Sequence, residues 1–137
     1  MYKRQKPDLA IAVDVGVAYD VPGMSSEKNQ GNLGDGPLVI MMDATSIAHD
    51  GFRKHIKEVA EAHHIPVQWA TTPGGGTDAG SIHVANEGIP TITIGVALRY
   101  MHSNVSVMHT DDYENSVQLI TEIVRSLNDD SYQSLMW

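Results

Sequence analysis

The fold is decided by residues 65–97, "IPVQWATTPGGGTDAGSIHVANEGIPTITIGVA". The segment Ile65 to Thr71 is apolar and predicts a strand, and its early proline stands where a missing N–H is tolerated. A glycine-rich loop follows, and residues 78–88 then predict a short helix that Gly88 ends. Ile89 to Ala97 is rich in β-branched residues and predicts the next strand. Strand, loop, helix and strand in this order are typical of α/β folds with parallel strands.

The segments on either side extend this pattern. Leu9 to Val15 and Pro37 to Asp43 are nearly continuous apolar runs, which are typical of strands buried on both faces of a parallel sheet. A first helix is predicted by the spacing of Phe52, Ile56, Val59, Ala60 and His63, with Ser46 or Asp50 as its N-cap. A second is predicted by the spacing of Tyr113, Val117, Ile120, Val124 and Leu127, with Asp111 and Glu114 as a capping box. Residues 128–137 are expected to form a frayed tail. We therefore predict one α/β domain with three layers, α/β/α, around a mostly parallel sheet.

Composition limits the partners that the protein can have. The 137 residues carry a formal net charge of −8, which argues against binding to nucleic acid or to an anionic membrane. There is no cysteine, so any metal ion would be bound by histidines and carboxylates. No apolar run approaches the roughly 20 residues of a membrane-spanning helix. The basic N-terminus has no apolar segment typical of a signal peptide behind it, so we expect a cytoplasmic protein.

Candidate site residues follow the predicted strands, because ligands of parallel α/β sheets bind at the carboxyl ends of the strands. This rule selects Asp14, Asp43, residues 71–78 and residues 99–102. Asp14 interrupts the most apolar strand, and a buried carboxylate needs a partner such as a metal ion, a cation or several N–H groups. Alternatively, Asp14 ends the strand and caps a loop. His102 has the side chain that zinc sites use most often among nitrogen ligands, although a lone loop histidine also fits a plain surface position.

The glycine loop permits two interpretations. Anion binding is a first possibility, but the loop lacks the Lys and Ser/Thr of a P-loop and the glycine spacing of a dinucleotide site. A strand-to-helix turn capped by Thr77 or Asp78 is the simpler alternative. Such a turn does not require three consecutive glycines, whereas backbone N–H groups close to a ligand would.

Together these features resemble a known family. The resemblance extends from about Pro7 to Leu127 and is carried by "AVDVGVAYDVPG", "GDGPLVIMMD", "TTPGGGTDAGSIHVANEGIPTITIGVALRYMHS" and "DDYENSVQLI". These segments look like the C-terminal half of the catalytic domain of the dinuclear metallo-aminopeptidases. This group includes glutamyl aminopeptidase, the tetrahedral aminopeptidases and proteins once labelled endoglucanase M. The resemblance implies that residues 1–137 are the C-terminal part of such a domain, without its upstream catalytic half and an inserted β domain.

The resemblance also implies roles for individual residues. Asp14 would bind one of two divalent metal ions, zinc or cobalt, and His102 would bind the other. The substrate cleft would be lined by Gly74, Gly75, Gly76, Thr77, Asp78, Arg99 and Tyr100. The implied activity is removal of N-terminal amino acids from a peptide substrate, and the complete protein would be a homo-oligomer.

A complete site of this family needs further residues. These are an upstream His-x-Asp motif, a metal-bridging Asp and a Glu-Glu pair, one member of which is the general base. No Glu-Glu occurs in this chain, and the residues before Asp14 include neither His nor Glu. We therefore expect no catalytic residue in this chain, an incomplete site and weak metal binding. The alternative is a non-catalytic assembly or binding remnant, and a glycosidase is disfavoured because no spaced pair of carboxylates is recognisable.

Overall fold

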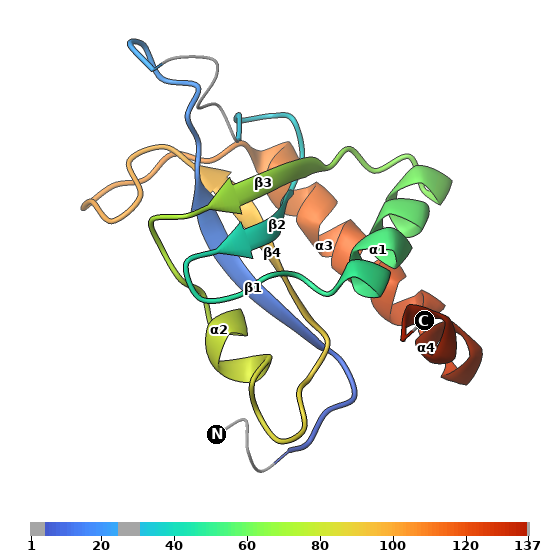
Figure 1. Ribbon diagram of the computed structural model, residues 1–137. Coiled ribbons are helices and arrows are strands. Elements are labelled where there is room, and N and C mark those ends of the chain that lie inside the picture. Colours follow the sequence, from blue (N-terminus) through green and yellow to red (C-terminus); the bar gives the residue numbers. More distant parts are fainter. Residues whose placement is uncertain (1–4, 25–30, 137) are drawn as a thin grey trace.

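The computed structural model describes residues 5–24 and 31–136 of the chain (Figure 1). Their elements are β1 (Ala10–Val17), β2 (Leu38–Asp43), α1 (Asp50–Ala62), β3 (Gln68–Thr72), α2 (Ala79–Ile82), β4 (Thr91–Leu98), α3 (Thr110–Ser126) and α4 (Asp129–Leu135). The four predicted strands and three predicted helices are all present, with ends that differ by up to three residues in the strands.

The sheet consists of two parallel pairs joined by an antiparallel pairing. Its strand order is β1-β4-β2-β3, with β1 parallel to β4, β2 parallel to β3, and β2 antiparallel to β4. The sheet is thus mostly parallel, as predicted. However, the carboxyl ends of β1 and β4 lie at the opposite end from those of β2 and β3. The premise that all candidate residues meet at one carboxyl edge is therefore wrong.

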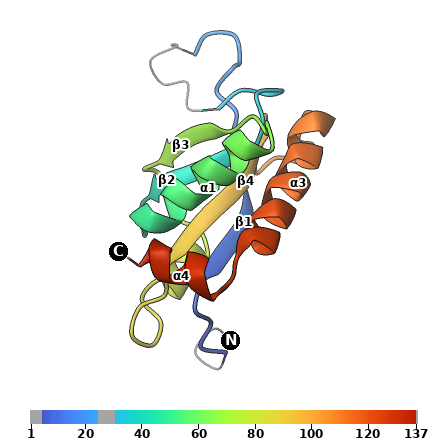
Figure 2. The same ribbon diagram turned by 90° about the vertical axis from the view of Figure 1, so that its right-hand side faces the viewer.

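The sheet lies between two helical layers, which confirms the predicted α/β/α arrangement. Figure 2 shows α1, α3 and α4 on the face of the sheet toward the viewer, and Figure 1 shows α2 on the other side of the strands. The main core fills the space beneath the three helices and includes Val39, Phe52, Ile56, Ile92, Ile94, Leu119, Ile123 and Leu135. Two smaller clusters lie elsewhere: one contains Leu38, Ile40, Ala70 and Ala97, and the other contains Ile82, Ala85 and Ile89.

Strand β1 is not buried on both faces as predicted. Val13, Asp14 and Val15 are exposed at its centre. The reason is its place in the sheet: within the described residues β1 is an edge strand, and β4 is the strand paired with it. The expectation that Asp14 is buried is therefore wrong for this chain.

Helix α1 buries the predicted side chains Phe52, Ile56, Val59 and Ala60. Its N-cap is His49, whose Nδ1 accepts a 3.3 Å hydrogen bond from the Phe52 amide, and not Ser46 or Asp50. Asp50 instead forms ion pairs with Arg53 and Lys54 in the first turn. The cap was misassigned because N-caps are usually Ser, Thr, Asp or Asn, whereas here an imidazole nitrogen accepts the hydrogen bond.

Helix α3 buries a face that is displaced by one residue from the predicted one. Its buried residues are Asp112, Ser116, Leu119 and Ile123. By contrast, Tyr113, Val117 and Val124 are 53%, 49% and 59% exposed. The helix is capped by His109, whose Nδ1 accepts from the Asp111 amide, so the predicted Asp111–Glu114 capping box is also wrong.

The buried carboxylate of Asp112 explains this displacement. Its two oxygens accept 2.8 Å hydrogen bonds from the Gly34 and Gly36 amides, which lie in a turn before β2. Both glycines have positive φ, so the turn depends on residues without a Cβ. Charge-assisted hydrogen bonds offset the cost of burying the carboxylate and fix this side of α3 against the domain.

The C-terminal segment forms helix α4, and the prediction of a frayed tail is wrong. Asn128 and Ser131 form a reciprocal capping box at its start. Leu135 is buried in the main core, which attaches the short helix to α1 and the sheet. A single core contact and a cap thus order a segment of polar composition.

Candidate functional site

The glycine loop is attached to the end of β2 through Asp43. Oδ2 of Asp43 accepts hydrogen bonds from the Thr77 amide at 3.2 Å and the Thr77 hydroxyl at 2.7 Å. Its Oδ1 accepts from the Thr45 amide and hydroxyl and from the Ser46 amide, at 2.7–2.8 Å. A further bond joins the Ala44 amide to the Gly75 carbonyl at 2.9 Å. The loop is therefore fixed by a carboxylate on a neighbouring strand.

These contacts also set the ionisation of Asp43. The side chain is buried, with a residue exposure of 6%. Burial alone would raise its pKa, but the hydrogen bonds from Thr77, Thr45 and Ser46 outweigh burial and lower the pKa to about 2. Asp43 is therefore ionised at neutral pH and acts here as a hydrogen-bond acceptor that positions the loop.

The three glycines of the loop serve different purposes. A Cβ on Gly76 would lie 2.8 Å from Cγ2 of Thr45, and a Cβ on Gly80 would overlap the Thr45 hydroxyl. Close packing against Thr45 therefore requires glycine at both positions. A Cβ on Gly74 or Gly75 would meet no atom within 4 Å. These two glycines border open space.

The loop, β1 and the segment after β4 together line a small pocket of about 140 Å³. Its lining residues are Asp14, Val15, Gly16, Ile40, Thr72, Gly75, Gly76, Thr77, Met101 and His102. Asp14 pairs in register with Gly95, two residues after Thr93 and therefore on the same face of the sheet. The Thr77 hydroxyl hydrogen-bonds the Thr93 hydroxyl at 2.9 Å. The glycine loop thus folds back over the face of the sheet opposite α1 and α3. This fold-back, and not a common carboxyl edge, brings the candidate residues together.

Asp14 and His102 approach the pocket from different elements. Asp14 is exposed on β1, and its Oδ1 accepts a 2.8 Å hydrogen bond from the following amide, that of Val15. His102 lies in the loop after β4, which the bridge between Arg99 and Val107 closes. It has a left-handed backbone with φ of 63°, which few non-glycine residues adopt. A carboxylate and an imidazole therefore border the same small space.

Four other predicted cleft residues do not line this pocket. Gly74, Asp78, Arg99 and Tyr100 are not among its lining residues. Arg99 donates from Nε and Nη2 to the two carboxylate oxygens of Asp20, at 3.0 and 2.7 Å, and this interaction lowers the pKa of Asp20. Asp78 is the N-cap residue of α2, as the alternative interpretation predicted, but its side chain makes no capping hydrogen bond.

Sequence reasoning selected two further residues of this region but not the roles that the structure gives them. Asp43 was selected only as a strand-end carboxylate, and its hydrogen bonds to Thr77 gave no signal in the sequence. Thr72 lines the pocket, and its Oγ1 is the buried side-chain oxygen that has no hydrogen-bond partner among the described residues. Neither residue has a spacing that would have distinguished it from an ordinary strand end.

A family model described as M42 glutamyl aminopeptidase matches residues 1–119. The chain belongs to this M42 family. The resemblance inferred from the quoted segments is thereby confirmed.

Relatives and solved structures agree with this assignment. A glutamyl aminopeptidase of Lactococcus lactis subsp. cremoris is 35% identical over 89% of this chain and 33% of its own length. The TET aminopeptidase from a marine sediment thaumarchaeon superimposes with a TM-score of 0.91 and 32% identity, over 94% of this chain and 36% of that one. PhTET1-12s, solved as a dodecamer, gives a TM-score of 0.75 with 29% identity, over 88% and 34% of the two chains. This chain therefore spans about a third of the length of the M42 proteins that it matches.

The donors of this M42 chain fit part of a metal site only. A carboxylate and an imidazole suit a divalent ion such as zinc, but stable zinc sites usually have three or four protein ligands. Within residues 5–24 and 31–136, no group of three or more His, Cys, Asp or Glu could hold a metal ion. The tripeptide His109-Thr110-Asp111 has the His-x-Asp pattern, but it lies at the start of α3, where His109 is the helix cap.

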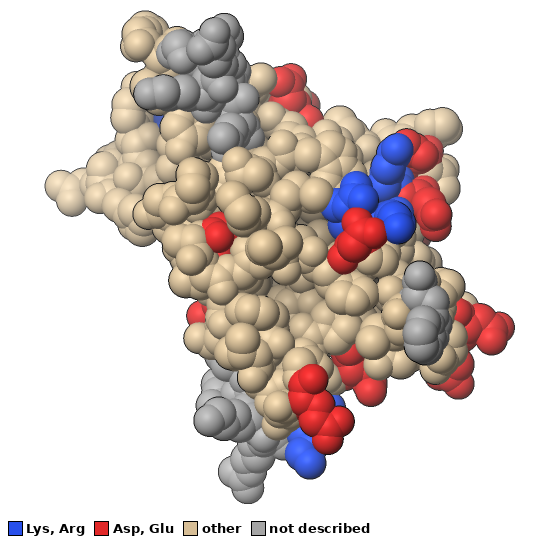
Figure 3. Space-filling model, viewed as in Figure 1, with Lys and Arg blue, Asp and Glu red and all other residues tan. Residues whose placement is uncertain are grey.

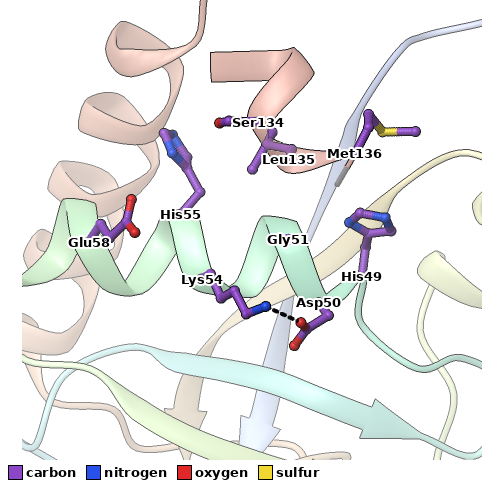
Figure 4. Close-up of a pocket in the computed structure, with 9 residues that line it drawn as sticks. All are labelled: His49, Asp50, Gly51, Lys54, His55, Glu58, Ser134, Leu135 and Met136. Atoms are coloured by element: carbon purple, nitrogen blue, oxygen red, sulfur yellow. Dashed lines mark ion pairs between the residues drawn. The ribbon is translucent and has the colours of Figure 1, made fainter. Parts of the chain in front are cut away.

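A larger cavity lies elsewhere in this M42 chain, between α1 and α4, with a volume of about 450 Å³ (Figure 4). Several of its polar groups are already engaged. Lys54 pairs with Asp50 at 2.7 Å, His49 caps α1, and Nε2 of His55 lies 2.8 Å from the Ser126 hydroxyl. Burial lowers the pKa of His55. We assign the site to the smaller pocket, because that pocket brings together ligand-type side chains from distant segments.

The surface of this M42 chain shows no broad basic area in the view of Figure 3. Positive groups gather on α1 beside acidic ones, as in the pairs that Arg53 and Lys54 form with Asp50. In the described part of the chain, no helix is long and apolar enough to cross a membrane.

Proposed function

We propose that this chain forms the C-terminal part of the catalytic domain of an M42 aminopeptidase, which removes N-terminal amino acids from peptides. The observation that carries the proposal is the pocket where Asp14, Gly75, Gly76 and His102 lie together. Because the chain spans about a third of its relatives, the activity belongs to a complete catalytic domain, to which this chain contributes one side of the site.

Asp14 would be a ligand of one divalent ion and His102 a ligand of the other, with zinc or cobalt as the metal. When bound, such ions activate a water molecule and polarise the scissile carbonyl. Gly75 leaves open space for the peptide backbone, and Asp43 holds the loop in place through Thr77. No residue of this chain is proposed as the general base. Roles in the cleft for Gly74, Asp78, Arg99 and Tyr100 remain predictions, as does a cytoplasmic location.

A peptide is the proposed substrate, and a homo-oligomer is the proposed state of the complete protein. The dodecameric arrangement of PhTET1-12s supports the second proposal. The alternative function is a non-catalytic assembly or binding remnant of the same fold. Its supporting observation is the lack of a third metal ligand beside Asp14 and His102 within the described residues.

Zinc titration by calorimetry tests the assignment of these two ligands. We expect weak binding, and chelator should barely change the melting temperature, because an ion far below its dissociation constant adds almost no stability. Asp14→Ala and His102→Ala should each remove one weak binding event and leave the other. His64→Asn is the control, since asparagine suits the left-handed backbone of that exposed residue (φ of 54°). One tight site lost in both variants would show that the two residues share a single ion.

A further inference from the structure

The loop after β4, residues 99–107, presents His102 without support from the core. Figure 1 shows this segment, in orange between β4 and α3, projecting beyond the sheet, and every residue from His102 to Asp111 is exposed. Tyr100 and His102 have left-handed backbones, with φ of 61° and 63°. Residues other than glycine keep such conformations only where neighbouring contacts impose them. Because no buried side chain is available, polar contacts must fix this loop.

An ion pair fixes the base of the loop. Arg99 donates from Nε to Oδ1 of Asp20 at 3.0 Å and from Nη2 to Oδ2 of Asp20 at 2.7 Å. Nη2 also donates to the backbone carbonyl of Asp20 at 3.0 Å. The side chains of Arg99 and Asp20 are only 33% and 21% exposed, so the pair is partly shielded from water. A bidentate contact of a guanidinium with a carboxylate sets direction as well as distance.

Asp20 joins two segments at the point where they leave the sheet. The parallel strands β1 and β4 end side by side, with Val17 opposite Leu98. Asp20 lies three residues beyond Val17, and Arg99 directly follows Leu98. Oδ2 of Asp20 also accepts a 3.2 Å hydrogen bond from the Leu33 amide, which holds the carboxylate in place. The ion pair therefore links the two segments that carry the candidate ligands.

A serine hydroxyl holds the tip of the loop. Oγ of Ser103 lies 2.6 Å from the carbonyl oxygen of Tyr100 and 2.7 Å from that of Val105. These contacts span His102 in the sequence, and the side chain of His102 lines the pocket. The loop is thus held at its base and at its tip, with the imidazole between the two points.

We propose that Asp20 is a positioning residue of the candidate site: through Arg99 it fixes the loop of residues 99–107 and so holds the imidazole of His102 at the pocket that Asp14 lines. Ser103 has the same role at the tip. This inference rests on the proposed function, in which His102 is a metal ligand. An imidazole that is already held in place loses little conformational entropy when its ligand binds.

The test is the mobility of the loop, measured by NMR relaxation of the backbone amides of this chain. In the wild type we expect an order parameter of about 0.85 at His102, the value of rigid backbone. Asp20→Asn removes the charge and Ser103→Ala removes the hydroxyl, and in each variant the order parameter should fall below about 0.6. Ser103→Thr retains the hydroxyl and should keep His102 ordered. Nuclear Overhauser contacts of the His102 ring with Val15, which also lines the pocket, should weaken in the two disruptive variants.

Two variants elsewhere control for a general loss of structure. Asp50→Asn also breaks a contact between a carboxylate and an arginine, that with Arg53 on α1. Ser134→Ala removes an exposed hydroxyl that is bonded within α4. Neither residue lies in the loop or lines the pocket, so both variants should leave His102 as ordered as in the wild type. The amide of Asp14 should stay ordered in every variant, because the pairing of β1 with β4 holds it.

The two proposals fail separately. Positioning by Asp20 is refuted if His102 is as ordered in Asp20→Asn as in the wild type, or if the loop is already mobile in the wild type. It is equally refuted if Asp20→Asn loosens Asp14 as much as His102, because Asp20 then supports the whole fold. The proposed function fails instead if the loop is ordered as expected and a zinc titration leaves the ring signals of His102 unchanged. In that case the imidazole is positioned, but not as a metal ligand.

Discussion

The carboxylate of Asp43 joins β2, the turn after it and the glycine loop. Five hydrogen bonds converge on its two oxygens, and two of them come from Thr77. The position of Thr77 in turn fixes Gly75 and Gly76, which line the pocket with Asp14 and His102. Asp43 is therefore a positioning residue, and its contribution should be visible in stability as well as in the site.

The low pKa of Asp43 predicts a loss of stability in acid. Its folded pKa of about 2 lies below the unfolded value, so the unfolded state binds the proton more readily. The resulting stability, about 2 kcal/mol, is fully present above roughly pH 4 and is lost as the pH falls toward 2. Urea unfolding of the wild type and Asp43→Asn should therefore differ most near pH 6, and the difference should shrink as the pH falls toward 2. A difference that stays constant with pH would contradict this account.

Individual residues also mark the limit of sequence reasoning. The positions of Asp14 and His102 could be selected from the sequence, because they interrupt or follow apolar strands. The role of Asp112 could not, because its partners Gly34 and Gly36 are more than 70 residues away and become neighbours only in the fold. An acidic residue at a helix start is ordinarily assigned to the surface. Long-range hydrogen bonds of this kind leave no local pattern.

At the scale of elements, the glycine loop should tolerate a side chain at one position and not at the next. Gly76→Ala should lower the free energy of unfolding by about 1–2 kcal/mol, because its Cβ crowds Thr45, whose hydroxyl is fixed by Asp43. Gly75→Ala should be neutral or slightly stabilising, since it faces open space without a positive φ. Chemical denaturation measures both. The double variant Gly76→Ala/Thr45→Ser lacks Cγ2 at residue 45, so it should regain part of the lost free energy of unfolding. Equal destabilisation by Gly75→Ala and Gly76→Ala would contradict the prediction.

The contact between α1 and α4 gives a second prediction. Alanine is favoured over glycine inside a helix by about 1 kcal/mol. At Gly51, however, an added Cβ would overlap the carbonyl oxygen of Leu135 in α4. Gly51→Ala should therefore lower the melting temperature, because α4 must move and Leu135 leaves the core. Lys57→Ala, at an exposed position of the same helix, is the control and should have little effect. A more stable Gly51→Ala variant would show that α4 adjusts freely.

The order and type of most elements could be predicted, but the orientation of α3 and the pairing of the sheet could not. Helix α3 carries two adjacent stripes with apolar residues, and Tyr113, Val117 and Val124 of the more apolar stripe are exposed. The less apolar stripe is buried because Asp112 and Ser116 have hydrogen-bond partners there. Similarly, apolar runs predict strands but not the direction of their neighbours, so the antiparallel contact of β2 with β4 had no local signal.

At the scale of the whole molecule, the chain should be inactive by itself. Without a general base, the rate of proton transfer falls by roughly 10²- to 10⁴-fold, and the metal ligands are also incomplete. We expect the pure chain to release no more nitroaniline from an aminoacyl-nitroanilide than the double variant Asp14→Ala/His102→Ala. Release is followed by absorbance, with and without added zinc or cobalt. Strong activity that chelator abolishes would mean that a residue of this chain serves as the base.

The pairing of β1 with β4 has a consequence for how the chain acquires its structure. Ala10 lies opposite Thr91, so β1 pairs with a segment about 80 residues later in the sequence. The apolar side chains of β1 therefore stay exposed to solvent while the intervening helices and strands are synthesised. Contacts of such sequence separation form slowly, because a long loop must close before any of them is gained. Until β4 has been made, β1 has no strand to pair with among the described residues, and the pairing of β1 with β4 is the step we expect to limit the rate of folding.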